Sequence, residues 1–367
     1  MIFDTPPVQS LLVKYENKPD FLVPRIITLT RSTKLDNERL YLETIIQQIK
    51  PAKQNELLGR LLNVDDTQHL SAWFEMMLFG WMRDVGDVEA EPSIEGNFPD
   101  LSVVIGKQKA FVEARVVLKT DLERDEEKLI NWIFWALRKI KKPYAINIID
   151  ARASRLPHVT DFCSKVECWL ETSPQEKYVF EDGSATIVME VISGPNPKFS
   201  SIEAIGSVGD AQWINSEPLK APLREKASQH KAIRKASLPY IIAIFLESPY
   251  LEAEEVVKAW FGQEVWVINA LNDENKVVDS YIDRSGIHFF GSEIRHTTVS
   301  GTLVFKAEFI ESDKRHYLKS WYIQNPFART PIDSSMLPVQ GRYIELERSE
   351  RGFRMGWQRG KDFYGNF

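Results

Sequence analysis

The order of its expected elements places this chain among the mixed α/β proteins. Windows with apolar residues at helical spacing alternate with short β-rich runs through the first two thirds of the sequence. From about residue 265 onward, β-like runs dominate. The chain has 367 residues, 43% of them hydrophobic, with ten Trp and twenty Phe, which is enough apolar material for a large core. We therefore predict a mixed sheet flanked by helices, with a β-rich C-terminal elaboration.

The N-terminal third is expected to be mainly helical. Residues 36–63 carry Leu and Ile at helical spacing, interrupted by Pro51, and residues 66–83 predict a second helix. Before them, the run from Phe21 to Leu29 has a β-like composition and predicts a short strand. We assign residues 1–65 to a helical extension.

A change of period after residue 83 predicts three strands, a helix and a fourth strand. Gly106–Lys109 separates two β-rich runs and predicts a hairpin. The helix at 121–142 is acidic in its first turns and basic in its last, as the helix dipole favours. With the helix at 66–83, the order is αβββαβ. The expected strands are 85–92, 101–105, 110–118 and 144–149.

Helix and strand alternation continues to about residue 260. We therefore divide the chain into the helical extension, an α/β core over 66–260, and a β-rich elaboration over 261–367 that packs on the core. The further expected helices are 156–172 and 222–236. The further strands are 185–192, 240–246, 265–270, 287–290, 299–309 and 317–323.

The predicted hairpin brings two carboxylates together. If its turn has an even number of residues, Asp100 can face Arg115 while Ser102 faces Glu113. Side chains alternate along a strand, so Asp100, Glu113 and Arg115 would project from one face. Two such carboxylates suit Mg²⁺, which completes its coordination with water and phosphate oxygens. The simpler alternative is a solvated strand face on which Glu113 and Arg115 form an ordinary ion pair.

Pro99-Asp100, followed on the next strand by Glu113-Ala114-Arg115, resembles the motif of the PD-(D/E)XK nuclease superfamily. The resemblance covers about residues 70–150. It implies a restriction-endonuclease-like core and a Mg²⁺- or Mn²⁺-dependent endonuclease that hydrolyses DNA, in prokaryotic defence or DNA processing. By the same resemblance Asp100 and Glu113 would be metal ligands, with Glu75 of the preceding helix as a third.

Arg115 departs from the family pattern, which has Lys at that position. Arg keeps the charge and can clamp a phosphate, but it is a poorer proton-transfer group. Three explanations remain open. Arg115 replaces the Lys and contacts the scissile phosphate, another basic residue has taken over the role, or catalysis is lost. The candidates for the second are Lys119, Lys226 and Lys231.

Charge gives a local rather than a global indication of a nucleic-acid partner. The formal net charge is −6, but the window from Lys220 to Lys235 is strongly basic. We predict DNA contacts at Lys119, Arg224, Lys226 and Lys231; a solvated helix face explains the same window equally well. The alternative function is a catalytically inactive nuclease-fold module that binds nucleic acid, a protein partner or a second copy of itself.

The sequence carries no sign of a membrane segment or of a disulfide framework. It has two Cys, no apolar N-terminal leader and no run of eighteen apolar residues, so we expect a cytoplasmic protein. The His residues are scattered, so the sequence does not predict a zinc site. It also has no Gly-rich phosphate loop, so it does not predict a nucleotide-dependent enzyme.

Overall fold

The chain forms two compact units. The computed structural model describes residues 2–196, 199–206, 216–229, 233, 237–269, 276–282, 284–290, 293–348 and 353–359. Unit 1 consists of Met1–Asn17, Pro24–Leu118 and Ile214–Phe367, and unit 2 of Lys18–Val23 and Lys119–Trp213. Unit 2 is therefore largely an insertion into unit 1, which the three segments expected from the sequence do not reflect.

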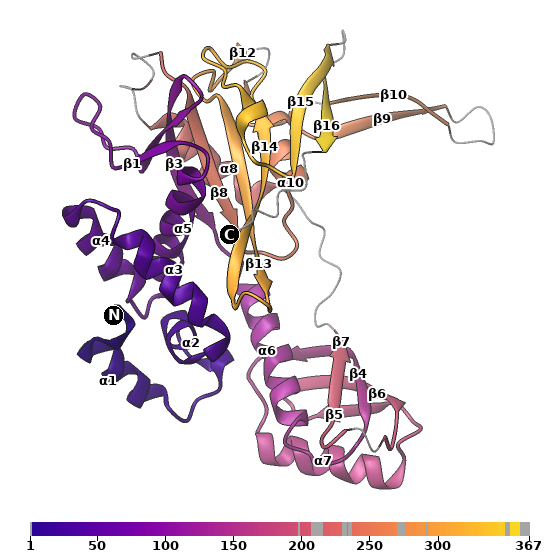
Figure 1. The fold of residues 1–367 in the computed structure, drawn as a ribbon. Helices are drawn as coiled ribbons and strands as arrows, with labels where there is room; N and C mark the ends of the chain where they lie inside the picture. The colour runs from indigo at the N-terminus through magenta and orange to yellow at the C-terminus, as the bar shows by residue number, and fades with distance from the viewer. Residues whose placement is uncertain are drawn as a thin grey trace. The chain divides into compact units, whose positions relative to one another are not determined.

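Helices make up the N-terminal part of unit 1 (Figure 1). Proline occupies the first turn of α1 and of α4, where its missing N–H costs nothing. The side chain of Asp65 caps α5 by accepting the Thr67 amide. The helices are α1 (Pro6–Tyr15), α2 (Arg25–Arg31), α3 (Asp36–Ile46), α4 (Pro51–Leu61) and α5 (Asp66–Arg83), with single 3-10 turns at Ile2–Asp4 and Thr33–Leu35.

The helical expectation for 36–63 and for 66–83 is confirmed. The predicted strand at 21–29 is wrong, because a 3-10 turn (Asp20–Leu22) and α2 occupy it. A short apolar run has too few residues to separate a buried helix from a buried strand by period.

One mixed sheet of eight strands forms the centre of unit 1, in the order β1-β2-β3-β8-β13-β14-β15-β16. β8 is parallel to both of its neighbours, and β15 is parallel to β14. All seven residues of β8 are buried and apolar, as the centre of such a sheet requires. The strands are β1 (Asp87–Ala90), β2 (Leu101–Ile105), β3 (Gln108–Val117), β8 (Tyr240–Leu246), β13 (Gly301–Ile310), β14 (Arg315–Gln324), β15 (Gly341–Arg348) and β16 (Phe353–Arg359).

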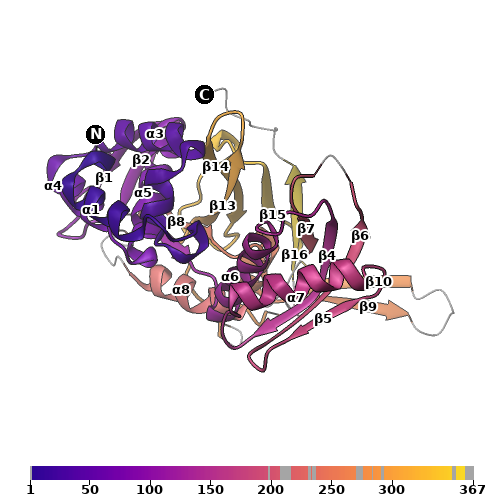
Figure 2. The ribbon, with the colours of Figure 1, turned by 90° about the horizontal axis from the view of Figure 1, so that it is seen from below.

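Helices cover both faces of this sheet (Figures 1 and 2). On one face, Trp73 and Phe74 of α5 contact Phe245 of β8. On the other, α8 (Glu217–Ser228) and α10 (Ala253–Phe261) share a core with Ile242 and Ile244. Alternate residues of β8 therefore serve two separate helical layers.

The β-rich C-terminal part is confirmed, and two ribbons accompany it in unit 1. β9 pairs with β10, and β11 pairs with β12. Their bounds are β9 (Glu264–Asn269), β10 (Lys276–Ile282), β11 (Phe289–Phe290) and β12 (Glu293–Ile294); a 3-10 turn lies at Ser334–Met336.

Unit 2 has a four-stranded sheet of its own, in the order β5-β6-β4-β7. Its helix α6 begins with a capping box formed by Thr120 and Glu123. Trp132, Phe162 and Phe180 meet edge-on in its core. The elements are α6 (Asp121–Leu137), β4 (Ala145–Ala153), α7 (Val159–Thr172), β5 (Tyr178–Glu181), β6 (Ala185–Ser193) and β7 (Glu203–Gly206).

The predicted pairing of these elements with the hairpin is therefore wrong. The helix and strand that follow the hairpin were expected to complete its sheet, but α6 and β4 belong to unit 2. The chain instead returns to unit 1 as α8 and β8, and β8 lies beside β3. The helix expected from Pro222 begins at Glu217, with Pro222 inside it.

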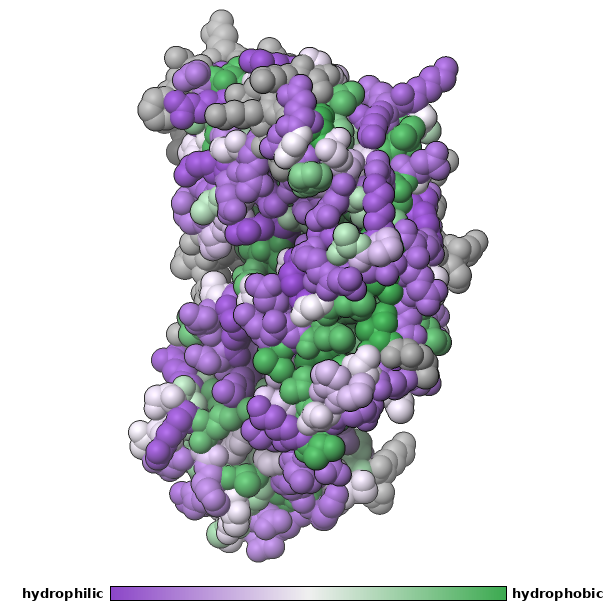
Figure 3. Space-filling view, turned by 90° about the vertical axis from the view of Figure 1, so that its left-hand side faces the viewer, coloured by the Kyte–Doolittle hydropathy of each residue, from purple (hydrophilic) through white to green (hydrophobic). Residues whose placement is uncertain are grey.

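The surface drawn in Figure 3 is mainly hydrophilic, with patches of apolar side chains exposed among the polar ones. No helix in the described ranges is long and apolar enough to cross a membrane.

Candidate functional site

The β2–β3 hairpin places Asp100 beside β3. Its turn is the two residues Gly106 and Lys107, with Gly106 at a φ of 60° that suits glycine. Asp100 directly precedes β2, and its Oδ2 accepts the Ala114 amide at 2.7 Å. Its carbonyl accepts the Glu91 amide at 2.9 Å. Main-chain groups on two sides thus hold the Asp100 loop in place.

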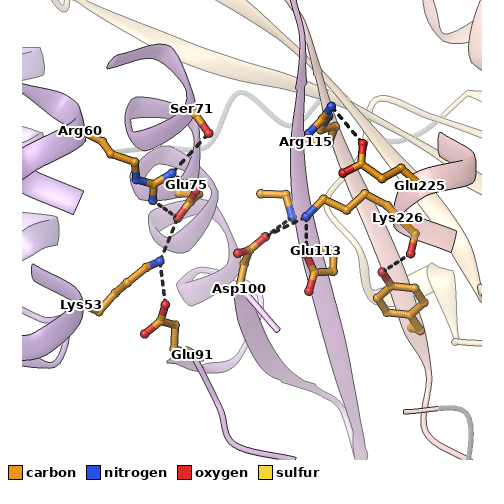
Figure 4. A network of polar contacts seen from close by, with 12 residues as sticks. Lys53, Arg60, Ser71, Glu75, Glu91, Asp100, Glu113, Arg115, Glu225 and Lys226 are labelled. Atoms are coloured by element: carbon orange, nitrogen blue, oxygen red, sulfur yellow. Dashed lines mark hydrogen bonds and ion pairs between the residues drawn. The ribbon is translucent and has the colours of Figure 1, made fainter. Parts of the chain in front are cut away.

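The hairpin register differs from the predicted one by two residues. Ser102 pairs with Phe111, rather than facing Glu113. A shift of two preserves the alternation of faces, and it brings Asp100 level with Glu113 instead of Arg115. The predicted common face is observed, because Asp100, Glu113 and Arg115 all contact helix α8 (Figure 4).

Glu113 is a charged residue in the interior of the sheet. It lies in the middle of β3, pairs with Ile242 of β8, and is 3% exposed. A carboxylate in such a place is costly unless a positive charge compensates it. Lys226 supplies that charge, with its Nζ 2.6 Å from Glu113 Oε2.

Lys226 reaches both acids from α8. Its Nζ lies 4.0 Å from Asp100 Oδ2 as well, and its side chain is 14% exposed. Leu223 and Ala227 fix this side of the helix against the sheet, and the Tyr240 hydroxyl donates to the Lys226 carbonyl at 2.9 Å. Burial acts to lower the pKa of Lys226, but the carboxylates of Asp100 and Glu113 outweigh it and raise that pKa.

Asp100 has an acidity far from that of a free aspartate. Burial is the largest cause, and the negative charges of Glu113 and Glu75 add to it. Lys226 and the Ala114 amide oppose the shift, and together these effects raise the pKa of Asp100 to about 8. The two acids therefore favour the uptake of a proton or of a further cation.

Glu75 lies beside this pair but is held by other partners. Its two oxygens accept from Arg60 at 2.7 and 2.8 Å, and Lys53 Nζ lies 3.3 Å from Oε2 (Figure 4). Glu75 and Asp100 line one small cavity together with Ala114. Glu75, the predicted third acid, therefore lies next to the site, and Arg60 and Lys53 of α4 already compensate its charge.

The other predicted residues take different positions. Arg115 Nη2 lies 3.2 Å from Glu225 Oε2, so it joins β3 to α8. Arg224 is exposed on α8. Lys119 belongs to unit 2 and contacts Glu127 at 2.8 Å. Lys231 lies outside the described residues.

Sequence reasoning missed the part that α4 and Glu225 play here. Lys53 and Arg60 lie two helical turns apart on α4, within the segment expected to be a helical extension. Nothing in the sequence therefore indicates that they contact Glu75. The charges of Glu225 and Lys226, adjacent on α8, are opposite to those of Arg115 and Glu113, which share one strand face. This match of opposite charges could have indicated that α8 packs on β3.

The arrangement can bind a hard cation through two carboxylates with an ammonium group beside them. Within the described ranges, no group of three or more His, Cys, Asp or Glu residues is placed to hold a metal ion. Mg²⁺ is commonly bound by one or two carboxylates, with water and phosphate completing its shell.

Comparisons with protein-family models, curated proteins and solved structures found no match to this chain.

Proposed function

We propose that this protein is a divalent-metal-dependent nuclease that hydrolyses DNA phosphodiester bonds. The observation that carries the proposal is the position of Lys226, within 2.6 Å of Glu113 and 4.0 Å of Asp100. Two carboxylates and one lysine are the groups that the motif at Pro99-Asp100 and Glu113 requires, and here the lysine comes from α8 instead of β3.

The order of elements supports a restriction-endonuclease-like core. In unit 1, α5 is followed by β1, β2 and β3, then by α8 and β8, with β8 parallel to β3. This is an αβββαβ order once unit 2 is set aside as an insertion between β3 and α8. The second helix and the fourth strand of this order are α8 and β8, in place of the α6 and β4 expected from the sequence.

The donor atoms at the site fit a magnesium or manganese ion. Asp100 and Glu113 each offer a carboxylate oxygen near Lys226 Nζ, at 4.0 and 2.6 Å, and carboxylate oxygens are the ligands that these hard cations prefer. When bound, such an ion lowers the pKa of a water molecule and offsets charge on a phosphate oxygen.

Lys226 is suited to an electrostatic role in this reaction. Its raised pKa keeps its ammonium group charged at neutral pH, so it can orient a water molecule or stabilise phosphate charge, but it cannot serve as the base. Arg115, engaged with Glu225, positions α8 on β3. Of the three explanations for Arg115, this favours transfer of the lysine role to Lys226.

The proposal is tested by cleavage of plasmid and single-stranded DNA in Mg²⁺ or Mn²⁺. We expect cleavage by the unaltered protein and a loss of about 100-fold or more in Asp100→Asn, Glu113→Gln and Lys226→Met. Lys220→Met is the matched control, because Lys220 lies on the same helix and its ammonium group pairs with Glu217 rather than with either acid of the site. Equal activity in all variants would refute the assignment.

A catalytically inactive nuclease-fold module is the second candidate, and a specific observation favours it. Glu113 is already neutralised by Lys226 and Glu75 by Arg60 and Lys53, so the charges balance without a metal ion. Such a protein would bind DNA or a partner without cutting. DNA retention in a gel-shift assay, with no cleavage of any substrate in either metal, would select this function.

A further inference from the structure

Unit 1 contains a second cavity, away from the acid pair. It is lined by residues of α3, of the C-terminal end of α5 and of the β13–β14 hairpin, and its volume is about 270 Å³. A cavity of this size holds a small molecule rather than a macromolecular segment. All of its lining residues belong to unit 1.

Most of its wall is aromatic and apolar. Glu308, Asp313 and Lys319 also line it, but Glu308 pairs with Lys319 at 2.7 Å and Asp313 accepts from the Tyr317 hydroxyl at 2.6 Å. Trp81 is held edge-on against Phe305 at 5.2 Å, and Met77, Leu318 and Ile310 complete the apolar surface. Such walls favour a ligand with an apolar body.

A glycine makes room for the ring that closes this wall. A Cβ atom at Gly80 of α5 would overlap the Tyr41 hydroxyl and would lie 2.9 Å from Ile45 Cδ1. A glycine inside a helix costs about 1 kcal/mol relative to alanine. Its use here lets Tyr41 lie directly across α5 at the cavity.

Asp84 places a carboxylate at the cavity. In the described part of the chain, this carboxylate has no hydrogen-bond or ion-pair partner, and burial raises its pKa despite the charges of Arg83 and Arg315. It is also the C-cap of α5, where the helix dipole disfavours a negative charge. Neither helix stability nor pairing within the protein favours this acid, which is exposed to solvent.

Arg315 places a positive charge at the same cavity. Its guanidinium carbon lies 4.6 Å from the Tyr41 ring centre and 4.1 Å from that of Tyr317, so two rings fix its orientation. Both Asp84 and Arg315 act on the acidity of Tyr41, which puts the two opposite charges near one aromatic wall.

We propose that this cavity binds a small zwitterion of the amino-acid class with an apolar or aromatic side chain. Asp84 receives the ammonium group, Arg315 receives the carboxylate, and Trp81, Met77 and Leu318 contact the side chain. The unpaired acid, the oriented guanidinium and the apolar wall between α5 and β14 together suit a molecule that carries both charges on an apolar body. The proposal is independent of the nuclease function.

Isothermal titration calorimetry with L-phenylalanine, L-tyrosine, L-leucine and L-methionine tests this. We expect at least one to bind, and 2-phenylethylamine and 3-phenylpropionate, which each lack one charge, to bind about 10-fold or more weakly. Asp84→Asn should weaken the binding of the amino acid by a similar factor. It should not reduce thermal stability, because it removes a negative charge from a helix C-terminus.

Glu311→Gln is the matched control, since it removes an exposed carboxylate from the β13–β14 turn outside the cavity lining. It should leave binding unchanged. Failure of all four amino acids to bind would overturn the proposal. So would undiminished binding to Asp84→Asn, or equal binding of the two singly charged compounds.

Discussion

At the scale of single residues, Asp100 makes the stability of the metal-free protein depend on pH. Its folded-state pKa of about 8 lies above the ordinary 3.8, so the unfolded chain loses this proton first as the pH rises. Folding therefore takes up a proton at Asp100 between these values, and the contribution of Asp100 to the free energy of unfolding falls as the pH rises from about 4 to about 8. Above about 8 this contribution is constant.

We expect Asp100→Asn to remove this pH dependence. Urea denaturation in the presence of a chelator, at pH values of about 5 and about 8, measures the difference in unfolding free energy between variant and unaltered protein. The variant should gain in relative stability at the higher pH. Because the other titrating groups are common to both proteins, a difference that does not change with pH would contradict the assigned acidity of Asp100.

Two helical glycines should respond in opposite ways to alanine. Gly80→Ala forces a Cβ into the Tyr41 hydroxyl, and we expect a loss of about 1–3 kcal/mol. Gly59 of α4 has nothing within 4 Å of the added atom, so Gly59→Ala should stabilise by up to about 1 kcal/mol. Chemical denaturation measures both. The same sign for the two substitutions would be inconsistent with the close approach of Tyr41.

At the scale of elements, local pattern predicted most helices and strands, including α5 at its observed ends. The hairpin and the shared face of Glu113 and Arg115 followed from the alternation of strand side chains, which survives a register shift of two. The acid pair could therefore be found from sequence.

The partners of the acid pair could not be predicted from the sequence. Lys119 was the nearest candidate in the sequence and Lys226 and Lys231 were more distant ones, because only the crossing of α8 back onto β3 and β8 selects Lys226. α6 and β4 look like the continuation of the hairpin in sequence, since an insertion with its own core carries no local mark. The cavity beside Asp84 was missed for the same reason, as its walls come from segments more than two hundred residues apart.

The N-terminus of α6 offers a test within unit 2. The Thr120 hydroxyl accepts the Glu123 amide, and the Glu123 carboxylate accepts the Thr120 amide. Thr120→Ala removes one half of this capping box, and we expect a loss of about 1 kcal/mol in the stability of unit 2. Thr172→Ala is a suitable control, because Thr172 ends α7 and bonds only within its own last turn.

At the scale of the whole molecule, two cores predict two unfolding events. Units 1 and 2 have separate hydrophobic clusters and separate sheets. Differential scanning calorimetry should therefore show two transitions rather than one two-state transition. Thr120→Ala should lower the midpoint of one, and Gly80→Ala that of the other. A single transition that both substitutions shift would show that the units unfold together.

The binding of Mn²⁺ measured by calorimetry tests most directly whether Asp100 and Glu113 form a metal site beside Lys226. We expect the unaltered protein and Lys220→Met to bind with equal affinity, and Asp100→Asn and Glu113→Gln each to weaken binding by at least about 10-fold, since even indirect metal partners contribute that much. Affinity in the two acid variants equal to that of the unaltered protein, or no binding by the unaltered protein, would contradict the site.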